Sequence, residues 1–468
     1  MVNKIQVQQY FENIASERSK WKRRNRLYYQ FLEKYFSFII PRGSKVLEIG
    51  CGTGELLNAV KPGYGVGIDF SSKMIELSQK QFPDLKFYVQ NAEELELNEK
   101  FDYIILSDLI GSLWDVQKTV KCLKKISNHK TRIVISYYNY LWEPILKFGE
   151  FIGMKMKQSL QNWLSPNDIK NLLDLENFEC IKTVRKLLFP KYIPLLSSFL
   201  NTFIGNLPII NKLCMTNIII ARPRIEMKKE YSVSIIIPAM NEKGNIEKAI
   251  KRIPKFGLKQ EYIFMEGNSS DGTFQEMLEV KERYKEKNIV VMKQSGKGKG
   301  NAVREGFNIA SGDVLIILDA DLTVPPEDLT KFYDAIQKNR GEFINGSRLI
   351  YQMENQAMRF LNLLGNKFFS MFFSYILGQR IKDTLCGTKV IFKSDYMKIK
   401  ENRNYFGDFD PFGDFDLLFG AAKLNLKIIE VPVRYKERKY GTTQIRRFSH
   451  GWLLIKMSLF GAKKMKFL

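Results

Sequence analysis

Apolar and polar positions in the first half of the chain alternate between strand-like and helical spacing. Apolar runs open the segments 45–54, 65–82 and 101–110, and each run ends in a glycine-rich or acidic turn or continues into a helical pattern. Strands that alternate with helices favour a parallel sheet covered by helices on both faces. A last apolar run, 215–224, leads into a polar stretch that we interpret as a linker.

The same rhythm restarts near residue 232, where further apolar runs end in polar, glycine-rich or acidic turns. A helical pattern such as 272–284 lies between two of these runs. We therefore predict an α/β fold with two domains in series, a Rossmann-like sheet followed by a second nucleotide-binding sheet. The predicted organisation is a first domain at 1–222, a linker at 223–230, a second domain at 231–445 and a basic amphipathic segment at 446–468.

The charge of the chain narrows the choice of partners. The 468 residues carry a formal net charge of +23, which favours an anionic partner such as a phosphorylated substrate, a membrane surface or a nucleic acid. Five scattered cysteines suggest neither a disulfide framework nor a zinc site. With only two histidines, a catalytic base is expected to be a carboxylate. We expect neither a secretory signal nor a membrane-spanning helix, hence a cytoplasmic protein.

Three glycines follow the first apolar run at alternating positions, Gly50, Gly52 and Gly54. Glycine suits a turn whose backbone must approach a ligand closely. Glu48 precedes this turn, and Asp69 ends the next run, where an acidic residue is expected to bind the hydroxyls of a ribose. A tight connection without a ligand, or a dinucleotide-binding oxidoreductase, is the alternative interpretation.

The pattern E-x-G-x-G-x-G resembles class I S-adenosylmethionine-dependent methyltransferases over roughly residues 1–222. The resemblance implies that the glycine turn holds the methionine part of the cofactor. By the same resemblance Ser107 and Asp108 face the methyl donor, although Asp108 is equally explained as a helix cap. The other cofactor-binding positions that the resemblance implies are Glu48, Gly50, Gly52, Gly54, Asp69, Asn91, Ala92 and Glu93.

Neither the methyl acceptor nor a catalytic base for methyl transfer can be read from the first half. Methyl transfer in this fold often depends on positioning more than on acid–base residues. The apolar stretch 187–210 is expected to be core or a cap over the pocket, with a membrane-facing surface as the alternative.

Two carboxylates, Asp319 and Asp321, end an apolar run of the second half. Like charges this close are tolerated when a divalent cation neutralises them, and Mg²⁺ or Mn²⁺ bridges carboxylates to substrate phosphates. The pair therefore predicts a metal site, and its D-x-D spacing resembles that of nucleotide-sugar enzymes; this resemblance implies Asp321 as the main ligand and Asp319 closer to ribose or sugar. The alternative is a helix-capping pair before residues 325–336.

Four segments in order, 234–246, 265–273, 296–307 and 311–322, resemble the family 2, GT-A-type glycosyltransferases over roughly residues 231–445. This resemblance implies donor contacts from residues that surround the two aspartates. They are Pro238, Asn241, Glu242, Glu266 and Asp271 for base and ribose, and Lys299 and Arg304 for the diphosphate. Where the family usually has two aspartates, this chain has Glu266 and Gly267.

Downstream segments look like the polyprenyl-phosphate branch of that family, which transfers sugar to dolichyl-type lipids. The resemblance implies that the acceptor phosphate and the sugar are bound by residues of these segments. They are Arg348, Asp383, Thr384, Cys386, Lys389, Asp416, Arg438 and Thr443. Gln444 stands where the family usually has a phosphate-binding lysine, and Arg446 or Arg447 is a possible substitute.

The implied reaction is an inverting transfer in which the acceptor oxygen attacks the anomeric carbon as the nucleoside diphosphate leaves. A hydroxyl acceptor needs a carboxylate base, whereas a phosphate acceptor is already anionic. We predict Asp416 as this base or as a sugar-aligning group, with Asp414 second. The run also contains Asp408 and Asp410, and for at least two of its four aspartates we expect no more than a solvated acidic loop.

Two segments, 358–378 and 446–468, mix apolar residues with lysine or arginine. Such helices can lie on an anionic membrane, which predicts peripheral contact with its cytoplasmic face; core or dimer helices are the alternative. Together these features predict a bifunctional methyltransferase and glycosyltransferase. The alternatives are a glycosyltransferase with a non-catalytic methyltransferase-like module, and a nucleic-acid-binding methyltransferase; the latter leaves the second half unexplained, so we expect no nucleic-acid partner.

Overall fold

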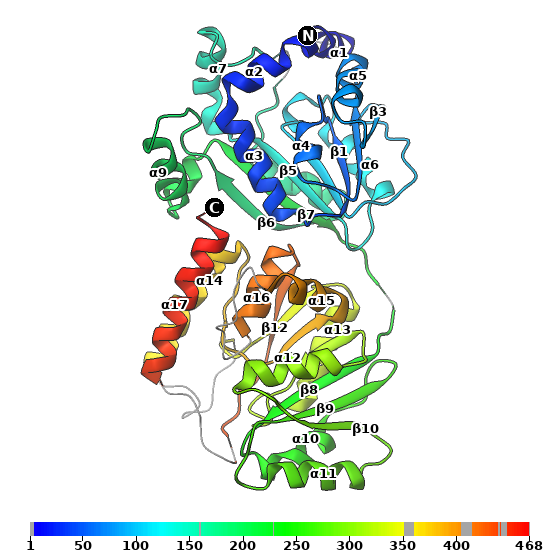
Figure 1. The fold of residues 1–468 in the computed structure, drawn as a ribbon, viewed down its shortest axis with the longest axis vertical. Helices are drawn as coiled ribbons and strands as arrows, with labels where there is room; N and C mark the ends of the chain where they lie inside the picture. The colour runs from blue at the N-terminus through cyan, green and yellow to red at the C-terminus, as the bar shows by residue number, and fades with distance from the viewer. Residues whose placement is uncertain are drawn as a thin grey trace. The chain divides into compact units, whose positions relative to one another are not determined.

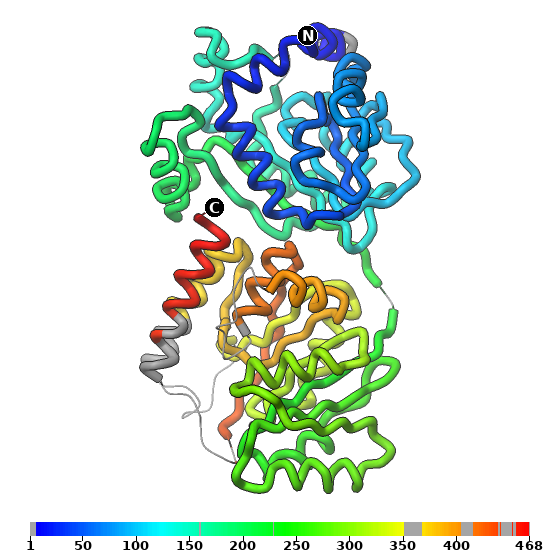
Figure 2. Tube along the Cα trace, in the orientation of Figure 1, coloured from blue at the N-terminus to red at the C-terminus, as the bar shows by residue number. Residues whose placement is uncertain are grey.

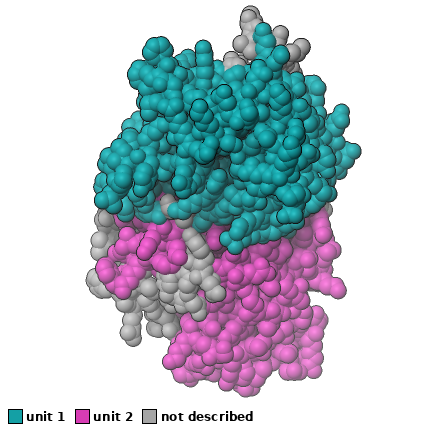
Figure 3. Space-filling model, turned by 45° about the horizontal axis from the view of Figure 1, so that its top comes forward, with its two compact units in different colours: residues 1–225, 467–468 teal, residues 226–466 magenta. Residues whose placement is uncertain are grey.

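The computed structural model describes residues 4–158, 161–227, 229–350, 360–403, 414–438, 440 and 447–467. Contacts within the chain divide it into two compact units, residues 1–225 with 467–468 (unit 1) and residues 226–466 (unit 2), coloured separately in Figure 3. Asp408, Asp410, Thr443, Gln444 and Arg446 lie outside the described residues. Among the described residues, no helix has the length and apolar character needed to cross a bilayer.

Unit 1 is a seven-stranded sheet in the order β3-β2-β1-β4-β5-β7-β6 (Figure 1). The first five strands in this order are parallel, whereas β7 pairs antiparallel with both of its neighbours. The strands are β1 (Lys45–Ile49), β2 (Tyr64–Asp69), β3 (Lys86–Val89), β4 (Tyr103–Ser107), β5 (Arg132–Tyr138), β6 (Phe178–Lys186) and β7 (Thr216–Pro223).

Helices cover both faces of this sheet. Residues of α3 pack on one face, and residues of α6 and α8 pack on the other, so the core lies in two layers. The α-helices are α1 (Lys4–Ile14), α2 (Arg18–Arg24), α3 (Arg26–Ile39), α4 (Glu55–Ala59), α5 (Ser72–Gln81), α6 (Val116–Leu123), α7 (Glu143–Phe151), α8 (Pro166–Leu175) and α9 (Leu196–Thr202).

Unit 2 is a second seven-stranded sheet, in the order β10-β9-β8-β11-β13-β12-β14. Its strands are β8 (Val233–Ala239), β9 (Gln260–Glu266), β10 (Asn288–Lys293), β11 (Val314–Ile317), β12 (Phe343–Ser347), β13 (Lys389–Phe392) and β14 (Ile428–Pro432). Its α-helices are α10 (Ile246–Arg252), α11 (Thr273–Arg283), α12 (Lys299–Ile309), α13 (Leu329–Gln337), α14 (Phe360–Leu377), α15 (Lys393–Glu401), α16 (Asp414–Lys423) and α17 (Arg447–Met465).

The two-sheet α/β fold agrees with the sequence analysis, but the sheets are not fully parallel. In unit 2, β13 runs antiparallel between β11 and β12. In unit 1 the strand β6, which the apolar pattern did not reveal, pairs with the next strand, β7, along its whole length (Figure 2). Its inward residues alternate with half-exposed ones, a pattern weaker than the continuous apolar runs of the central strands.

The order of strands reverses between β1 and β4 in unit 1, and between β8 and β11 in unit 2. In open α/β sheets, ligands bind beyond the carboxyl ends of the strands at such a switch point. The glycine turn after β1 and the aspartates after β11 therefore stand where a ligand is expected.

Candidate active sites

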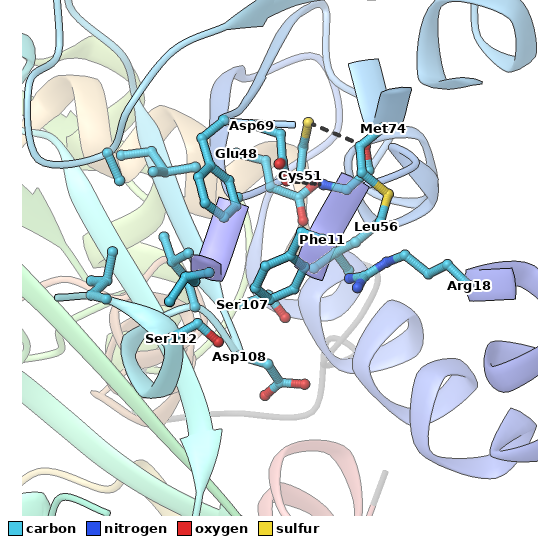
Figure 4. A pocket seen from close by; sticks show the side chains of 18 of the residues that line it. Phe11, Arg18, Glu48, Cys51, Leu56, Asp69, Met74, Ser107, Asp108 and Ser112 are labelled. Atoms are coloured by element: carbon cyan, nitrogen blue, oxygen red, sulfur yellow. Dashed lines mark hydrogen bonds between the residues drawn. The ribbon is translucent and has the colours of Figure 1, made fainter. Parts of the chain in front are cut away.

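A cavity of about 400 Å³ opens at the carboxyl ends of the central strands of unit 1 (Figure 4). Its lining combines residues of the glycine turn, the ends of the strands and the first two helices. Most residues that the sequence analysis assigned to a cofactor are in its wall: Glu48, Gly50, Gly52, Asp69, Asn91, Ala92, Glu93, Ser107 and Asp108.

The glycine turn depends on backbone conformations that favour glycine. Gly50, Gly52 and Gly54 have φ angles of +73°, +52° and +79°. A Cβ added at Gly52 would lie 2.9 Å from Nε of Arg18, so this glycine brings the backbone close to that side chain. Gly54 is absent from the cavity wall, and its Cβ would instead meet the ring of Phe87 at 2.8 Å.

Asp69 is held rigidly at the end of β2. One carboxylate oxygen accepts the N–H of Gly52 at 2.9 Å, and the other accepts the N–H of Ser71 at 3.0 Å. Burial raises the pKa of this carboxyl, while the two N–H groups and Arg18 oppose that rise. Each oxygen keeps a free lone pair, so the side chain can still accept from the hydroxyls of a bound sugar.

Glu48 is buried at the end of β1, and its Oε2 has no hydrogen-bond partner. Burial raises the pKa of this carboxyl to about 8, despite the opposing charge of Lys22. Lys22 is paired instead with Glu55, at 2.5 Å, and also donates to the hydroxyl of Thr53 at 3.2 Å. A protonated Glu48 would present a hydrogen-bond donor inside the cavity.

Arg18, at the start of α2, is a cavity residue that the sequence analysis missed. Its guanidinium points toward the glycine turn in Figure 4, and its buried Nε has no hydrogen-bond partner. Burial opposes the charge of this guanidinium, but Tyr29 and the carboxyls around it raise its pKa. The buried Nε–H still lacks an acceptor, and an anionic group of a ligand would supply one. The run 18–26 is rich in lysine and arginine, and sequence alone did not distinguish this inward arginine from the solvated ones.

Asp108 follows β4 and has a φ angle of +51°, which is unusual for a residue with a side chain. Both carboxylate oxygens accept from the hydroxyl of Tyr28, at 2.8 and 2.7 Å. Burial raises the pKa of Asp108 to about 6, against the opposing effects of Tyr28 and Arg18. Ser107 beside it is hydrogen-bonded to the hydroxyl of Ser136 at 3.0 Å.

Glu93 organises the cavity wall through the backbone. Its Oε1 accepts the N–H groups of Trp114 and Asp115, at 2.9 and 3.0 Å. Asn91 in turn accepts the N–H of Glu93 at 3.0 Å, which closes a tight turn. Both side chains line the cavity, and Glu93 fixes the loop that follows β4.

In unit 2, each of the two aspartates after β11 is paired with a cation. Lys299 at the start of α12 lies 2.6 Å from Asp319. Arg438 bridges two carboxylates, Asp321 at 2.8 Å and Glu242 at 2.6 Å. The other oxygen of Asp321 accepts from the N–H and hydroxyl of Thr323, so one edge of this carboxylate caps a turn.

The residues expected to bind the donor lie at the ends of β8 and β9 and in the turns that follow. Pro238 belongs to β8, and Glu266 ends β9. Asn241, with a φ angle of +56°, accepts the N–H of Ser270 at 2.9 Å. Asp271 accepts the N–H of Lys243 at 3.2 Å, and buried Glu266 accepts the N–H of Ser269. Arg304 lies on α12, one turn after Lys299.

The expected acceptor-binding residues include a buried ion pair. Arg348 donates to both oxygens of Asp383, at 2.7 and 2.8 Å. Burial opposes ionisation of Asp383, but Arg348 outweighs it and lowers the pKa of the carboxyl. Buried Lys389 donates to the carbonyl of Cys386, and the buried hydroxyl of Thr384 has no hydrogen-bond partner.

Asp416, the expected base, belongs to a different cluster on α16. Its Oδ2 accepts from Arg403 at 2.9 Å, and Arg403 also donates to the hydroxyl of Tyr396 at 3.4 Å. The side chains of Asp414 and Arg447 lie outside the description, although both residues belong to helices.

The residues around Asp321 suit a hard divalent cation in their chemistry. Across the described part of the chain, no three metal-ligating side chains gather closely enough to hold an ion alone. Mg²⁺ and Mn²⁺ are often bound by one or two carboxylates together with substrate phosphates. Asp319 and Asp321 would meet that smaller requirement, with Lys299 and Arg438 as the cations that balance them in this structure.

Two family models match the chain in separate regions. The methyltransferase domain model matches residues 20–183, and the glycosyl transferase family 2 model matches residues 234–399. A solved S-adenosylmethionine-dependent methyltransferase from Thermotoga maritima covers 46% of this chain and 99% of its own, with 17% identity and a TM-score of 0.38.

Curated relatives match part of the chain. A dolichol-phosphate mannosyltransferase of Pyrococcus furiosus is 39% identical over 25% of this chain and 33% of its own length. A dolichyl-phosphate beta-glucosyltransferase of Saccharomyces cerevisiae is 29% identical over 45% of this chain and 68% of its own length. Glycosyltransferase AglJ of Haloferax volcanii is 28% identical over 45% of this chain and 65% of its own. This chain thus carries a methyltransferase domain followed by a glycosyl transferase family 2 domain.

Proposed function

We propose that this protein transfers a sugar from a nucleotide-sugar donor to a polyprenyl phosphate or a related lipid-linked acceptor, and that its first domain methylates a separate acceptor group. The observation that carries the methyltransferase half is the cavity in which Arg18, Gly52 and Asp69 converge. The glycosyltransferase half is supported by the family match and by the charged cluster around Asp321.

In the first domain, Asp69 would accept from the ribose hydroxyls of S-adenosylmethionine, and the turn at Gly52 would follow its methionine part. Arg18 would bind the carboxylate of that methionine as a charge-assisted donor. The bound cofactor supplies an electrophilic methyl group. Asp108, with its pKa raised to about 6 by burial, is suited to accept a proton from the methyl acceptor near neutral pH.

In the second domain, Asn241, Glu266 and Asp271 would surround the base and ribose of the donor. Lys299, the first residue of α12, and Arg304, five residues later, would meet the diphosphate. A divalent cation held by Asp319 and Asp321 would offset the charge of the departing diphosphate. Since a phosphate acceptor is already an anion, the ion-paired state of Asp416 does not obstruct this route.

The named relatives support a lipid-phosphate acceptor, since two of them act on dolichol or dolichyl phosphate by name. Such an acceptor places the second domain at a membrane surface. The segments 358–378 and 446–468 would provide peripheral contact through their mixed apolar and basic residues.

The proposal is tested with the full chain, Mg²⁺ or Mn²⁺, a panel of nucleotide sugars and a polyprenyl phosphate. We expect release of nucleoside diphosphate with one donor, and loss of that release in Asp321→Asn. Turnover unchanged by the substitution would refute the metal assignment. Titration of the same protein with S-adenosylmethionine tests the first domain, since absence of binding would remove the cofactor from the proposal.

Binding and methylation are separated by two further measurements. Asp69→Asn is expected to weaken cofactor binding, whereas Asp108→Asn should leave binding nearly unchanged and slow methyl transfer to the glycolipid product or its precursor. Cofactor binding without methylation of any lipid, sugar or nucleotide tested would instead favour a non-catalytic methyltransferase-like module.

A further inference from the structure

The stretch between β6 and β7 buries apolar side chains at its two ends, such as Leu187 and Met215, but leaves most of its middle part exposed, contrary to the expectation of a core or cap segment. None of its residues lines the cavity of unit 1. Nine of its large apolar side chains are instead more than a third exposed: Tyr192, Ile193, Leu195, Leu196, Phe199, Phe203, Leu207, Ile209 and Leu213. A patch of this extent on a protein surface marks a contact site.

The polar side chains of this stretch point the other way and hold its backbone. Asn201 bonds both the N–H and the carbonyl of Phe189, at 2.8 Å each. Buried Asn206 accepts from the buried ammonium of Lys186 at 2.8 Å. Polar groups thus lie inside and apolar groups outside, so the exposed face is a built surface.

Leu195, just before α9, is the most exposed of these apolar side chains. It has a φ angle of +63° and is 89% exposed. With a ψ angle of −47° it lies at the centre of a γ-turn, in which the carbonyl of Pro194 accepts the N–H of Leu196 at 2.7 Å, and this kind of turn is rare and strained. Because the side chain makes no buried contact that repays this strain, its value lies in what it meets outside the chain.

A second exposed apolar segment adjoins this stretch. Trp142 donates to the carbonyl of Leu213 at 2.7 Å, and Asn139 donates to the carbonyls of Lys212 and Cys214 at 2.9 Å. In Figure 1 and Figure 2, α7 and α9 lie toward the same side of unit 1. The exposed apolar side chains of this segment are Tyr140, Leu141, Ile145, Phe148, Phe151, Ile152 and Met154.

The charge around these two segments is positive. Residues 187–215 contain two lysines and no acidic residue. The two glutamates of α7 are neutralised by Lys147 and Lys155. Lys191 donates to Asn25, which joins the stretch to the basic run 18–26 and its exposed Arg23 and Arg24.

We infer that the two apolar segments of unit 1, 140–154 and 192–213, form a docking surface for an anionic lipid bilayer. Aromatic and aliphatic side chains beside uncompensated cations fit the boundary between acyl chains and anionic headgroups. This surface belongs to the methyltransferase domain, and its Phe203 ring lies 5.9 Å from the ring of Phe467 at the end of the segment 446–468. It does not depend on either proposed transferase activity.

The test is flotation of the full chain with vesicles of phosphatidylcholine alone and of phosphatidylcholine mixed with phosphatidylglycerol. We expect binding to the anionic vesicles only. The double variant Leu195→Asn with Ile209→Asn should lower the partition coefficient at least about tenfold. The reason is that burying one leucine or isoleucine side chain contributes a free energy equivalent to about tenfold in partitioning. Both side chains are more than four-fifths exposed, so the melting temperature should not fall.

The matched control is Leu175→Asn with Leu258→Asn, two exposed leucines outside this surface, which should bind as the wild type does. Light scattering of the wild type and the double variant examines self-association. Equal vesicle binding of wild type and double variant would overturn the inference. So would a wild-type dimer that the double variant converts to monomer, because the surface would then serve a second copy of the chain.

Discussion

At the scale of single residues, the cavity of unit 1 is defined by buried polar atoms that lack hydrogen-bond partners. Arg18 brings a guanidinium with an unsatisfied Nε, and Glu48 brings a carboxyl oxygen without a donor. Each would be destabilising in an isolated domain, and each is relieved by a ligand with groups of opposite character. These two side chains therefore carry more information about the ligand than the residues with satisfied hydrogen bonds.

Arg18→Gln is expected to weaken the binding of S-adenosylmethionine by about 10–100-fold, since it removes a charge-assisted hydrogen bond. Isothermal titration calorimetry on the full chain measures this change. Decarboxylated S-adenosylmethionine provides the sharper comparison, because it should bind wild type and variant with similar affinity. Lys20→Gln, which removes an exposed charge on the same helix, is the control. If Arg18→Gln weakened the binding of S-adenosylmethionine and of its decarboxylated form equally, Arg18 would not bind the carboxylate.

Asp108 predicts a pH dependence of stability. Its folded-state pKa is raised to about 6, so the folded chain holds this proton more tightly than the unfolded chain, whose carboxyl titrates near pH 4. The contribution of Asp108 to stability is therefore lost as the pH rises from about 4 to about 6. Asp108→Asn should gain roughly 1–3 kcal/mol relative to wild type across this window.

Denaturant unfolding at several pH values measures the difference between the variant and the wild type, which cancels the other acidic groups. Asp84→Asn, at an exposed position, should give a flat difference. A flat difference for Asp108→Asn as well would mean that this carboxyl is already ionised throughout the window.

At the scale of elements, the turn after β1 and the helix α2 form one binding feature. The turn supplies a backbone that approaches the cavity, and α2 supplies the cation that faces it. In unit 2, a segment beyond β14 returns to the ends of β8 and β11 through Arg438. In both units, the charged group that completes the site comes from outside the sheet.

Gly52→Ala should abolish cofactor binding, because the added methyl group would displace Arg18. Gly43→Ala is a matched control, since Gly43 has a φ angle of +78° and nothing within 4 Å of the added Cβ. Both variants should lose about 1–2 kcal/mol of stability from the left-handed conformation. Calorimetric titration distinguishes them, and retained binding in Gly52→Ala would show that the cofactor does not need this approach.

Arg438→Gln leaves Glu242 and Asp321 without their shared cation. Unit 2 should lose about 1–3 kcal/mol in metal-free buffer, and Mn²⁺ should restore part of that loss by replacing the missing charge. Thermal melting with and without Mn²⁺ measures both effects. Arg252→Gln breaks an exposed ion pair with Glu327, and it should show neither the loss of stability nor the rescue by Mn²⁺. If Mn²⁺ did not restore any of the stability lost in Arg438→Gln, this would argue against a divalent cation at this place.

At the scale of the whole molecule, two separate cores suggest two separate unfolding events. Calorimetry of the full chain should resolve two transitions. S-adenosylmethionine at a hundredfold excess over its Kd should raise one of them by roughly 5–10 °C, and Mn²⁺ with a nucleoside diphosphate should raise the other. A single transition that responds to both ligands would show that the units unfold together.

The sequence was sufficient for the two α/β units, because the central strands are continuous apolar runs with glycine or acidic residues at their ends. For the same reason, most of the residues that it assigned to a cofactor lie in the wall of the cavity. It did not reveal Arg18, since helical position and not residue type turns this one arginine inward. Nor did it reveal the pairing of Asp321 with Arg438, 117 residues apart in sequence. Long-range ion pairs leave no local pattern.

The outward stretch 187–210 shows the opposite error. Its apolar content suggested burial, and the structure places those side chains in solvent because Asn201 and Asn206 occupy the interior positions. A pattern of apolar residues identifies a surface that is favourable to bury. It does not tell whether other parts of the same chain or a separate partner bury it.

The cations at Asp319 and Asp321 have a practical consequence for the glycosyltransferase half. Lys299 and Arg438 already balance the charge of these carboxylates. The proposed metal ion, arriving with the donor, would therefore replace two side-chain cations and would not be needed to stabilise the fold. Chelating agents are therefore expected to stop sugar transfer while the protein stays folded and able to bind the metal ion again.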